Sequence, residues 1–96
     1  MSLVFEWDPR KARSNLRKHH VSFAEAVSVF ANPLARIFPN DEHSVEEVRE
    51  IIMGHSPLRR LLLVCFMVLD DDRVRIISAR RATREERHDY EEHVTS

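Results

Sequence analysis

The stretch Leu61-Leu62-Leu63-Val64-Cys65-Phe66-Met67-Val68-Leu69 decides the fold, because all of its residues are apolar and none of its positions alternates with a polar one. A strand that is half exposed alternates, so this pattern predicts a central strand covered on both faces. Asp70-Asp71-Asp72 follows as a turn, and Val74–Arg80 is predicted as the next strand. A connection this short makes the two strands antiparallel neighbours.

The first third of the chain predicts a strand followed by two helices. Leu3–Trp7 is β-prone, and Asp8-Pro9 then provides an N-cap carboxylate and a proline at the first helical position. A second helix is predicted from the capping box Ser22-Phe23-Ala24-Glu25, in which serine and glutamate each satisfy an orphan backbone donor. Asn32-Pro33 ends that helix.

Two further strands and a last helix complete the prediction. Leu34–Phe38 lies between prolines and is expected near an edge, and Val48–Met53 is expected to lead into a turn at Gly54. A second capping box, Thr83-Arg84-Glu85-Glu86, predicts a helix from about Arg84. We therefore expect an α+β fold in the order β-α-α-β-β-β-β-α, with an antiparallel sheet of four to five strands, two N-terminal helices on one face and a C-terminal helix.

Composition narrows the class of protein. The 96 residues, 43% of them hydrophobic, suffice for one core and predict a single domain over residues 1–96. No apolar run reaches the roughly 18–20 residues that span a bilayer, and no signal peptide precedes the first strand, so we expect a cytoplasmic protein without a membrane partner. Cys65 reads as buried core filler, which fits a reducing compartment.

The charges are segregated although the formal net charge is only -1. The segment 10–20 is basic, 41–50 is acidic, and the last third is rich in arginine. This pattern predicts a basic face beside an acidic one, or only solvated helix faces. The helix predicted after Ala82 has few apolar residues that could pack on a core. Its folding is therefore expected to depend on a partner or on pairs such as Arg87 with Glu91.

A set of short motifs extends from the first strand to the last helix: Phe5-Glu6-Trp7-Asp8, Lys11-Ala12, Asn15, Lys18-His19, Val21-Ser22-Phe23, Glu47-x-Arg49 with Gly54, Arg75-Ile76-Ile77-Ser78-Ala79-Arg80-Arg81-Ala82-Thr83, Glu86-Arg87 and Tyr90. Together they resemble the BrnT family of type II toxin–antitoxin ribonuclease toxins. One position departs from the family pattern, since His20 stands where a glycine is usual, and histidine would pay a cost for positive φ there.

The resemblance implies a RelE-like fold and inhibition of translation by RNA cleavage. It also implies a cognate BrnA-like antitoxin whose DNA-binding part represses the shared operon, so that DNA is reached only through the partner. A toxin–antitoxin hetero-tetramer is compatible with such a partnership. The competing interpretation is a catalytically silent module that binds this DNA-binding antitoxin and acts as a transcriptional co-repressor.

Metal-independent RNA cleavage requires a base for the 2′-hydroxyl, cations for the phosphorane and an acid for the leaving oxygen. Arg80, at the strand exit before the capped helix, is the first candidate, and Arg49 could join it in a phosphate clamp. His19 is a candidate for proton transfer, and Lys18 for a phosphate contact. Each residue also has a non-functional interpretation. The arginines could form structural ion pairs, and the other two could simply occupy exposed loop or helix positions.

Three more residues are candidates for contact with RNA or the partner: Arg81, Glu86 and Tyr90. Glu86 is interpreted first as a capping residue. Tyr90 could stack on a base, but as the one large ring on its helix it is expected rather to pack locally. The scattered histidines show no metal-ligand spacing, and the chain has one glycine and hence no phosphate-binding loop. We therefore expect neither a metal nor a cofactor.

Overall fold

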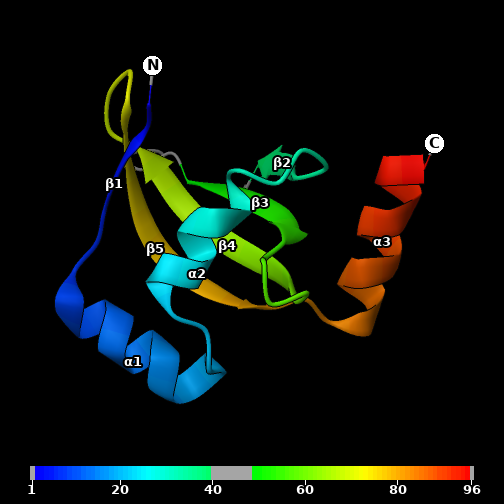
Figure 1. The fold of residues 1–96 in the computed structure, drawn as a ribbon, viewed down its shortest axis with the longest axis horizontal. Coiled ribbons are helices and arrows are strands. Elements are labelled where there is room, and N and C mark those ends of the chain that lie inside the picture. The colour runs from blue at the N-terminus through cyan, green and yellow to red at the C-terminus, as the bar shows by residue number, and fades with distance from the viewer. Residues whose placement is uncertain (1, 40–48, 96) are drawn as a thin grey trace.

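Strand β4 lies at the centre of a five-stranded sheet in the computed structural model, which describes residues 2–39 and 49–95. The order across the sheet is β1-β5-β4-β3-β2, with helices on both faces (Figure 1). The elements are β1 (Val4–Glu6), α1 (Pro9–His19), α2 (Phe23–Val29), β2 (Arg36–Pro39), β3 (Glu50–His55), β4 (Leu61–Val68), β5 (Arg73–Arg81) and α3 (Arg84–Thr95).

The predicted α+β class and element order are confirmed, with one correction to the sheet. Strands β2 to β5 are antiparallel neighbours in chain order, as their short connections require. The first strand, β1, instead pairs in parallel with β5, so the sheet is mixed. No hairpin joins these two strands, because two helices and three strands separate them along the chain, and nothing local forces them to be antiparallel.

The two faces of the sheet bury different cores. Helices α1 and α2 cover one face, which we call the helical face. Its core comprises Val21, Phe23, Ala26, Val29, Ile52, Leu62, Val64, Phe66, Val74, Ile76 and Ala79. On the other face, α3 packs over a smaller cluster of Met53, Leu61 and Tyr90. The central strand β4 is therefore covered from both sides, as its unbroken apolar sequence predicts.

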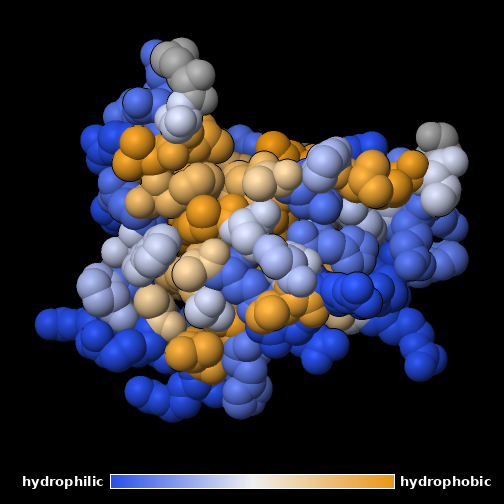
Figure 2. Space-filling model, in the orientation of Figure 1, coloured by the Kyte–Doolittle hydropathy of each residue, from blue (hydrophilic) through white to orange (hydrophobic). Residues whose placement is uncertain are grey.

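The surface of the molecule reflects this arrangement. Figure 2 shows mostly hydrophilic residues over α1 and over much of α3, and an apolar area between them, over α2 and the strands around it. No helix within residues 2–39 and 49–95 is long and apolar enough to cross a membrane. The acidic segment 41–48, including the start of the predicted strand Val48–Met53, lies outside the described residues.

Helix α1 has the predicted start and an unusual end. Asp8 accepts a hydrogen bond from Arg10 N at 2.8 Å, and Pro9 occupies the first turn. At the C-cap, His20 adopts the left-handed conformation with φ 59° and ψ 31°. The loop thus does need positive φ at this position, and histidine provides it at a conformational cost.

The capping box predicted for α2 is only half formed. Ser22 Oγ accepts from Glu25 N at 3.0 Å, but the Glu25 carboxylate does not return this bond and turns to the β3–β4 hairpin. There it accepts from Ser56 Oγ at 2.7 Å and from Arg60 Nε at 2.9 Å, and it forms a salt bridge with Arg60. These bonds hold the pKa of Glu25 below its usual value, so the carboxylate ties α2 to the hairpin.

The prediction that Gly54 lies in a turn is wrong. Gly54 is in β3, opposite Leu62, and its φ is not positive. The position requires glycine for a steric reason, since a Cβ there would lie 2.9 Å from the Cβ of Ala35 and 3.1 Å from Cγ1 of Val29. The hairpin instead places its positive φ, 63°, at Arg59.

Substitution Gly54→Ala is therefore expected to destabilise the fold by about 1–3 kcal/mol, because the added methyl overpacks the helical face. Urea unfolding measures this cost. The double variant Gly54→Ala/Ala35→Gly removes the nearest clashing atom and should recover part of the loss. Equal stability of Gly54→Ala and the wild type would show that this close approach is not under steric constraint.

Candidate active site

Strand β5 alternates between the two faces of the sheet. On the helical face its side chains are buried: Val74, Ile76 and Ala79. On the other face they are polar and exposed or half exposed: Arg73, Arg75, Ser78 and Arg80. We call this second surface the open face of β5. The change of spacing between Arg75 and Ser78 follows from an irregularity in the β4–β5 pairing next to Cys65 and Phe66.

The guanidinium of Arg80 is held by the cap of α3. Nη1 donates to Glu86 Oε1 at 2.8 Å and Nη2 donates to Glu86 Oε2 at 2.7 Å, which is a bidentate pair. Glu86 also completes the predicted capping box, accepting from Thr83 N at 2.9 Å while Glu86 N donates to Thr83 Oγ1 at 3.1 Å. One carboxylate thus fixes both the arginine and the helix that follows it.

This pairing sets the protonation state of Glu86. The hydrogen bonds from Arg80, with help from Thr83, lower the pKa of Glu86 to about 2, although burial opposes the shift. Glu86 is therefore ionised at neutral pH and is too weak a base to accept a proton from a hydroxyl. The structure assigns it to holding Arg80 rather than to proton transfer.

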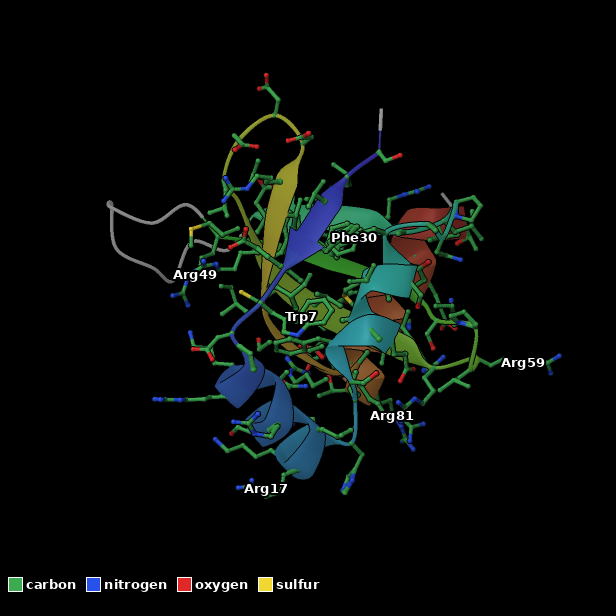
Figure 3. All side chains as sticks on the ribbon, turned by 60° about the vertical axis from the view of Figure 1, so that its left-hand side comes forward. Trp7, Arg17, Phe30, Arg49, Arg59 and Arg81 are labelled. Atoms are coloured by element: carbon green, nitrogen blue, oxygen red, sulfur yellow. The ribbon has the colours of Figure 1, made fainter. Side chains whose placement is uncertain are left out.

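Arg81, although adjacent to Arg80 in sequence, faces the opposite way. It pairs across the sheet with Leu62, a residue of the helical face, whereas Arg80 pairs with Leu63. Its charge contributes to the lowered pKa of Glu25 on α2. Figure 3 shows Arg81 below α2, close to the ribbon of that helix and away from Arg49. The cationic run of the sequence is split between two faces.

Lys18 and His19 line a groove of about 190 Å³ between α1 and the edge of β5. The other residues of the groove are Lys11, Ser14, Asn15, Ile77 and Ser78. Ser78 belongs to the open face, so the groove opens beside it. Because residues two apart on one strand face lie about 7 Å apart, Ser78 brings the groove next to Arg80.

Asn15 holds this groove together. Its amide Nδ2 donates to the carbonyls of Ala79 at 2.7 Å and Val21 at 2.9 Å, and Oδ1 accepts from Ala79 N at 3.0 Å. Asn15 is only 6% exposed, so α1 is docked through a buried polar contact along the part of β5 beyond β1. The sequence analysis noted Asn15 only within a motif. Its signal is the spacing of three residues from Ala12, which places it on the side of α1 that packs on the core.

Arg49 lies apart from Arg80. Met53 pairs with Leu63, which pairs with Arg80, whereas Arg49 precedes Met53 by four residues. Four residues of strand span about 13 Å and two strand spacings about 10 Å, which together place the Cα atoms about 16 Å apart. The structure therefore brings Arg80 near the Lys18–His19 groove and does not bring Arg49 to the same point.

Arg73 and Arg75 extend the open face toward β1. Both bond to Glu6, with Arg75 Nη2 donating at 2.7 Å and Arg73 Nη2 at 3.1 Å. These bonds lower the pKa of Glu6. Both arginine side chains are about half exposed, at 49% and 48%, so they remain accessible to an anion. Among the described residues, no group of three or more His, Cys, Asp or Glu side chains is arranged to hold a metal ion.

Tyr90 packs locally, so little of its ring is available to stack on an RNA base. The ring is 2% exposed, packs with Met53 and Leu61, and donates its hydroxyl to the carbonyl of Leu34 at 2.8 Å. Burial raises the pKa of this hydroxyl. Tyr90 anchors α3 to the sheet, which also explains how a helix with so few apolar residues stays in place.

The Arg80–Glu86 pair predicts a pH dependence of stability. A carboxylate whose pKa falls from 4.5 to about 2 on folding stabilises the protein above pH 4.5, and this contribution disappears as the pH falls toward 2. Since Arg80 is 37% exposed, screening reduces the contribution to about 1–2 kcal/mol. The free energy of unfolding of Glu86→Gln should therefore lie below that of the wild type at pH 6 and converge with it near pH 2. A gap that is unchanged between these pH values would contradict this assignment.

Comparisons with protein families and with solved structures show which proteins this chain is similar to. The family model for the ribonuclease toxin BrnT, of type II toxin–antitoxin systems, matches residues 7–86. The crystal structure of the Brucella abortus ribonuclease toxin BrnT has a similar fold, with a TM-score of 0.65 at 23% sequence identity, covering 88% of this chain and 99% of that one. No curated protein matches the chain. Because the family match spans most of the sequence, the chain belongs to the BrnT family of ribonuclease toxins of type II toxin–antitoxin systems.

Proposed function

We propose that this chain is a metal-independent endoribonuclease toxin that cleaves RNA on the open face of β5, inhibits translation and is neutralised by a BrnA-like antitoxin. The family supports the ribonuclease class, and the geometry supports the location. The observation that carries the proposal is the placement of Lys18 and His19 beside Ser78 in the groove between α1 and β5, with Arg80 two residues further along the same strand face.

The substrate is held by charge along this face. Arg73 and Arg75 at one end, Lys11 and Lys18 along α1, and Arg80 at the other end form a cationic track. A single strand of RNA presents one phosphate per nucleotide, and a positively charged groove that follows its backbone is the usual way to bind it. Binding should weaken steeply as salt increases, because each neutralised phosphate releases counterions.

Arg80 retains donors for a phosphate although it is paired. A guanidinium has five N–H donors, and two of those of Arg80 go to Glu86 and a third to the carbonyl of Arg81 at 3.3 Å. The remaining donors can bind the developing charge of the phosphorane. The pairing with Glu86 fixes the guanidinium before substrate arrives, which lowers the cost of orienting it in the transition state.

The proposed reaction is transesterification by the 2′-hydroxyl. His19 accepts the 2′-hydroxyl proton as the 2′-oxygen bonds to phosphorus, Arg80 and Lys18 stabilise the phosphorane, and the P–O5′ bond breaks. The leaving 5′-oxygen takes a proton from the Lys18 ammonium or from the imidazolium so formed. The products are a 2′,3′-cyclic phosphate and a 5′-hydroxyl, and no water or metal enters this step.

His19→Ala should lower the rate of RNA cleavage by about 10²-fold, which is the usual contribution of one general acid–base group. The matched control is His20→Asn, which changes the adjacent imidazole but keeps a residue that tolerates the left-handed conformation found there. Cleavage of a fluorescently labelled oligonucleotide by the purified variants gives both rates. Equal rates for the wild type and His19→Ala would remove His19 from the reaction.

The function itself is tested by expression and by product analysis. Expression of the chain alone should arrest growth, and the purified protein should cut RNA at the same rate with and without excess EDTA. Mass spectrometry of the fragments should find cyclic phosphate ends. Cleavage that stops with EDTA and returns with added metal would overturn the proposed mechanism.

A second candidate function is a silent module that binds an antitoxin and co-represses its operon. The observation that favours it is the bidentate hydrogen bonding of the Arg80 guanidinium to Glu86. A purely structural arginine would show the same pairing. Partner binding without any RNA cleavage across a pH series would select this alternative.

A further inference from the structure

A pocket of about 340 Å³ lies between α3 and the sheet, on the side of β4 opposite α2. Its walls on the sheet are the apolar side chains of Phe38, Ile51, Met53 and Leu63, from three neighbouring strands. Tyr90 lines it from α3. The catalytic proposal uses none of these four sheet residues.

The rim of this pocket is acidic. Three acids, Glu86, Asp89 and Glu92, line it from α3 together with one histidine, His93, and Asp89 and Glu92 are exposed. The helix as a whole carries more acids than arginines: Glu85, Glu86, Asp89, Glu91 and Glu92 against Arg84 and Arg87. An occupant with apolar groups at its centre and positive charges around them would complement this surface.

RNA does not fit that description. Each nucleotide carries a negative phosphate, and like charges placed against Asp89 and Glu92 would be repelled. The cationic track on β5 provides the favourable place for the nucleic acid. The pocket is instead suited to a protein segment that inserts an apolar side chain while flanking Lys or Arg residues face the rim.

We propose that this pocket is a docking site for a segment of the antitoxin with an apolar anchor flanked by basic residues. This inference rests on the proposed function, because it takes an antitoxin as the partner. The pocket adjoins the candidate active site, since Leu63 pairs across the sheet with Arg80 and Glu86 lines the pocket while holding Arg80. A segment anchored here would lie beside Arg80 and could exclude RNA from it.

The test uses overlapping 15-residue peptides that span the protein encoded beside the toxin gene, labelled with fluorescein. The chain is released from its complex under denaturing conditions, refolded, and titrated with each peptide by fluorescence anisotropy. Peptides with an apolar residue flanked by Lys or Arg should bind. Asp89→Lys/Glu92→Lys should weaken their binding at least tenfold, because the rim then repels them.

The matched control is Glu85→Lys/Glu91→Lys, which makes the same change of net charge on exposed positions of α3 that do not line the pocket. It should change the dissociation constant by no more than about twofold, because its charges do not face the bound segment directly. Ile51→Ser removes apolar surface from the wall and leaves the acidic rim unchanged. It should also weaken binding of the peptides.

The inference is overturned if both double variants weaken peptide binding equally, or if no peptide binds the wild type. It is also overturned if Asp89→Lys/Glu92→Lys leaves peptide binding intact but changes the KM or sequence preference of RNA cleavage, which would make the pocket a base-binding site. RNA cleavage is measured on the same preparation of the free chain. If this preparation cleaves RNA but binds no peptide, the docking proposal fails while the proposed function stands.

Discussion

Arg80→Ala should cleave RNA at least 10²-fold more slowly than the wild type, whereas Arg81→Ala should remain within about threefold of it. The loss at position 80 has the size expected when one preorganised donor to a charged transition state is removed. Position 81 is an unusually close control, because the two arginines are adjacent in sequence but pair with Leu63 and Leu62, which lie on different faces of the sheet.

Arg80→Ala also leaves Glu86 without its partner, so stability has to be separated from catalysis. Glu86→Gln keeps Arg80 and disturbs the same cap, and its rate should fall much less than that of Arg80→Ala when both are folded by circular dichroism. If Arg80→Ala and Arg81→Ala lose the same activity, the open face is not the site of cleavage.

Asn15→Ala should reduce the free energy of unfolding by about 3 kcal/mol, because it leaves buried groups of Ala79 and Val21 without their hydrogen bonds. The same change should disorder the groove between α1 and β5 and lower cleavage in the fraction that remains folded. Urea unfolding gives the stability, and cleavage rates are then compared under conditions where both proteins are folded.

Ser14→Ala is the matched control for Asn15. Ser14 is the preceding residue on α1 and lines the same groove, but the hydrogen bonds to β5 and Val21 come from Asn15. We expect its stability to stay within about 0.5 kcal/mol of the wild type, as for most substitutions away from buried networks. A stable Asn15→Ala variant would show that α1 is held to β5 by other contacts.

The fold could be predicted where local chemistry determines it. The proline and caps at Asp8, Ser22 and Thr83 locate the starts of all three described helices, and the unbroken apolar run 61–69 locates the central strand. Local chemistry does not determine how β1 pairs, since its partner is remote in sequence. Gly54 was misread for a related reason, because the side chains it must avoid, Ala35 and Val29, are distant in the chain.

The candidate site was predicted less completely. Candidate residue types can be picked from the sequence, but strand alternation and register decide which of them meet. Alternation separates Arg80 from Arg81, and register separates Arg80 from Arg49. Local packing of Tyr90 could be expected from the sequence, but its partners Met53 and Leu61 could not, because they lie on strands distant in the chain.

The measurement that tests the location of the site most directly is a map of backbone amide shifts by NMR as RNA is added. The ligand is an oligonucleotide with 2′-O-methyl groups, which cannot be cleaved by attack of a 2′-hydroxyl. We predict that the shifts concentrate on the open face of β5, at Arg75, Ser78 and Arg80, and on Lys18 and His19. Shifts confined to the helical face, around Arg60, Arg81 and α2, would contradict the proposed site.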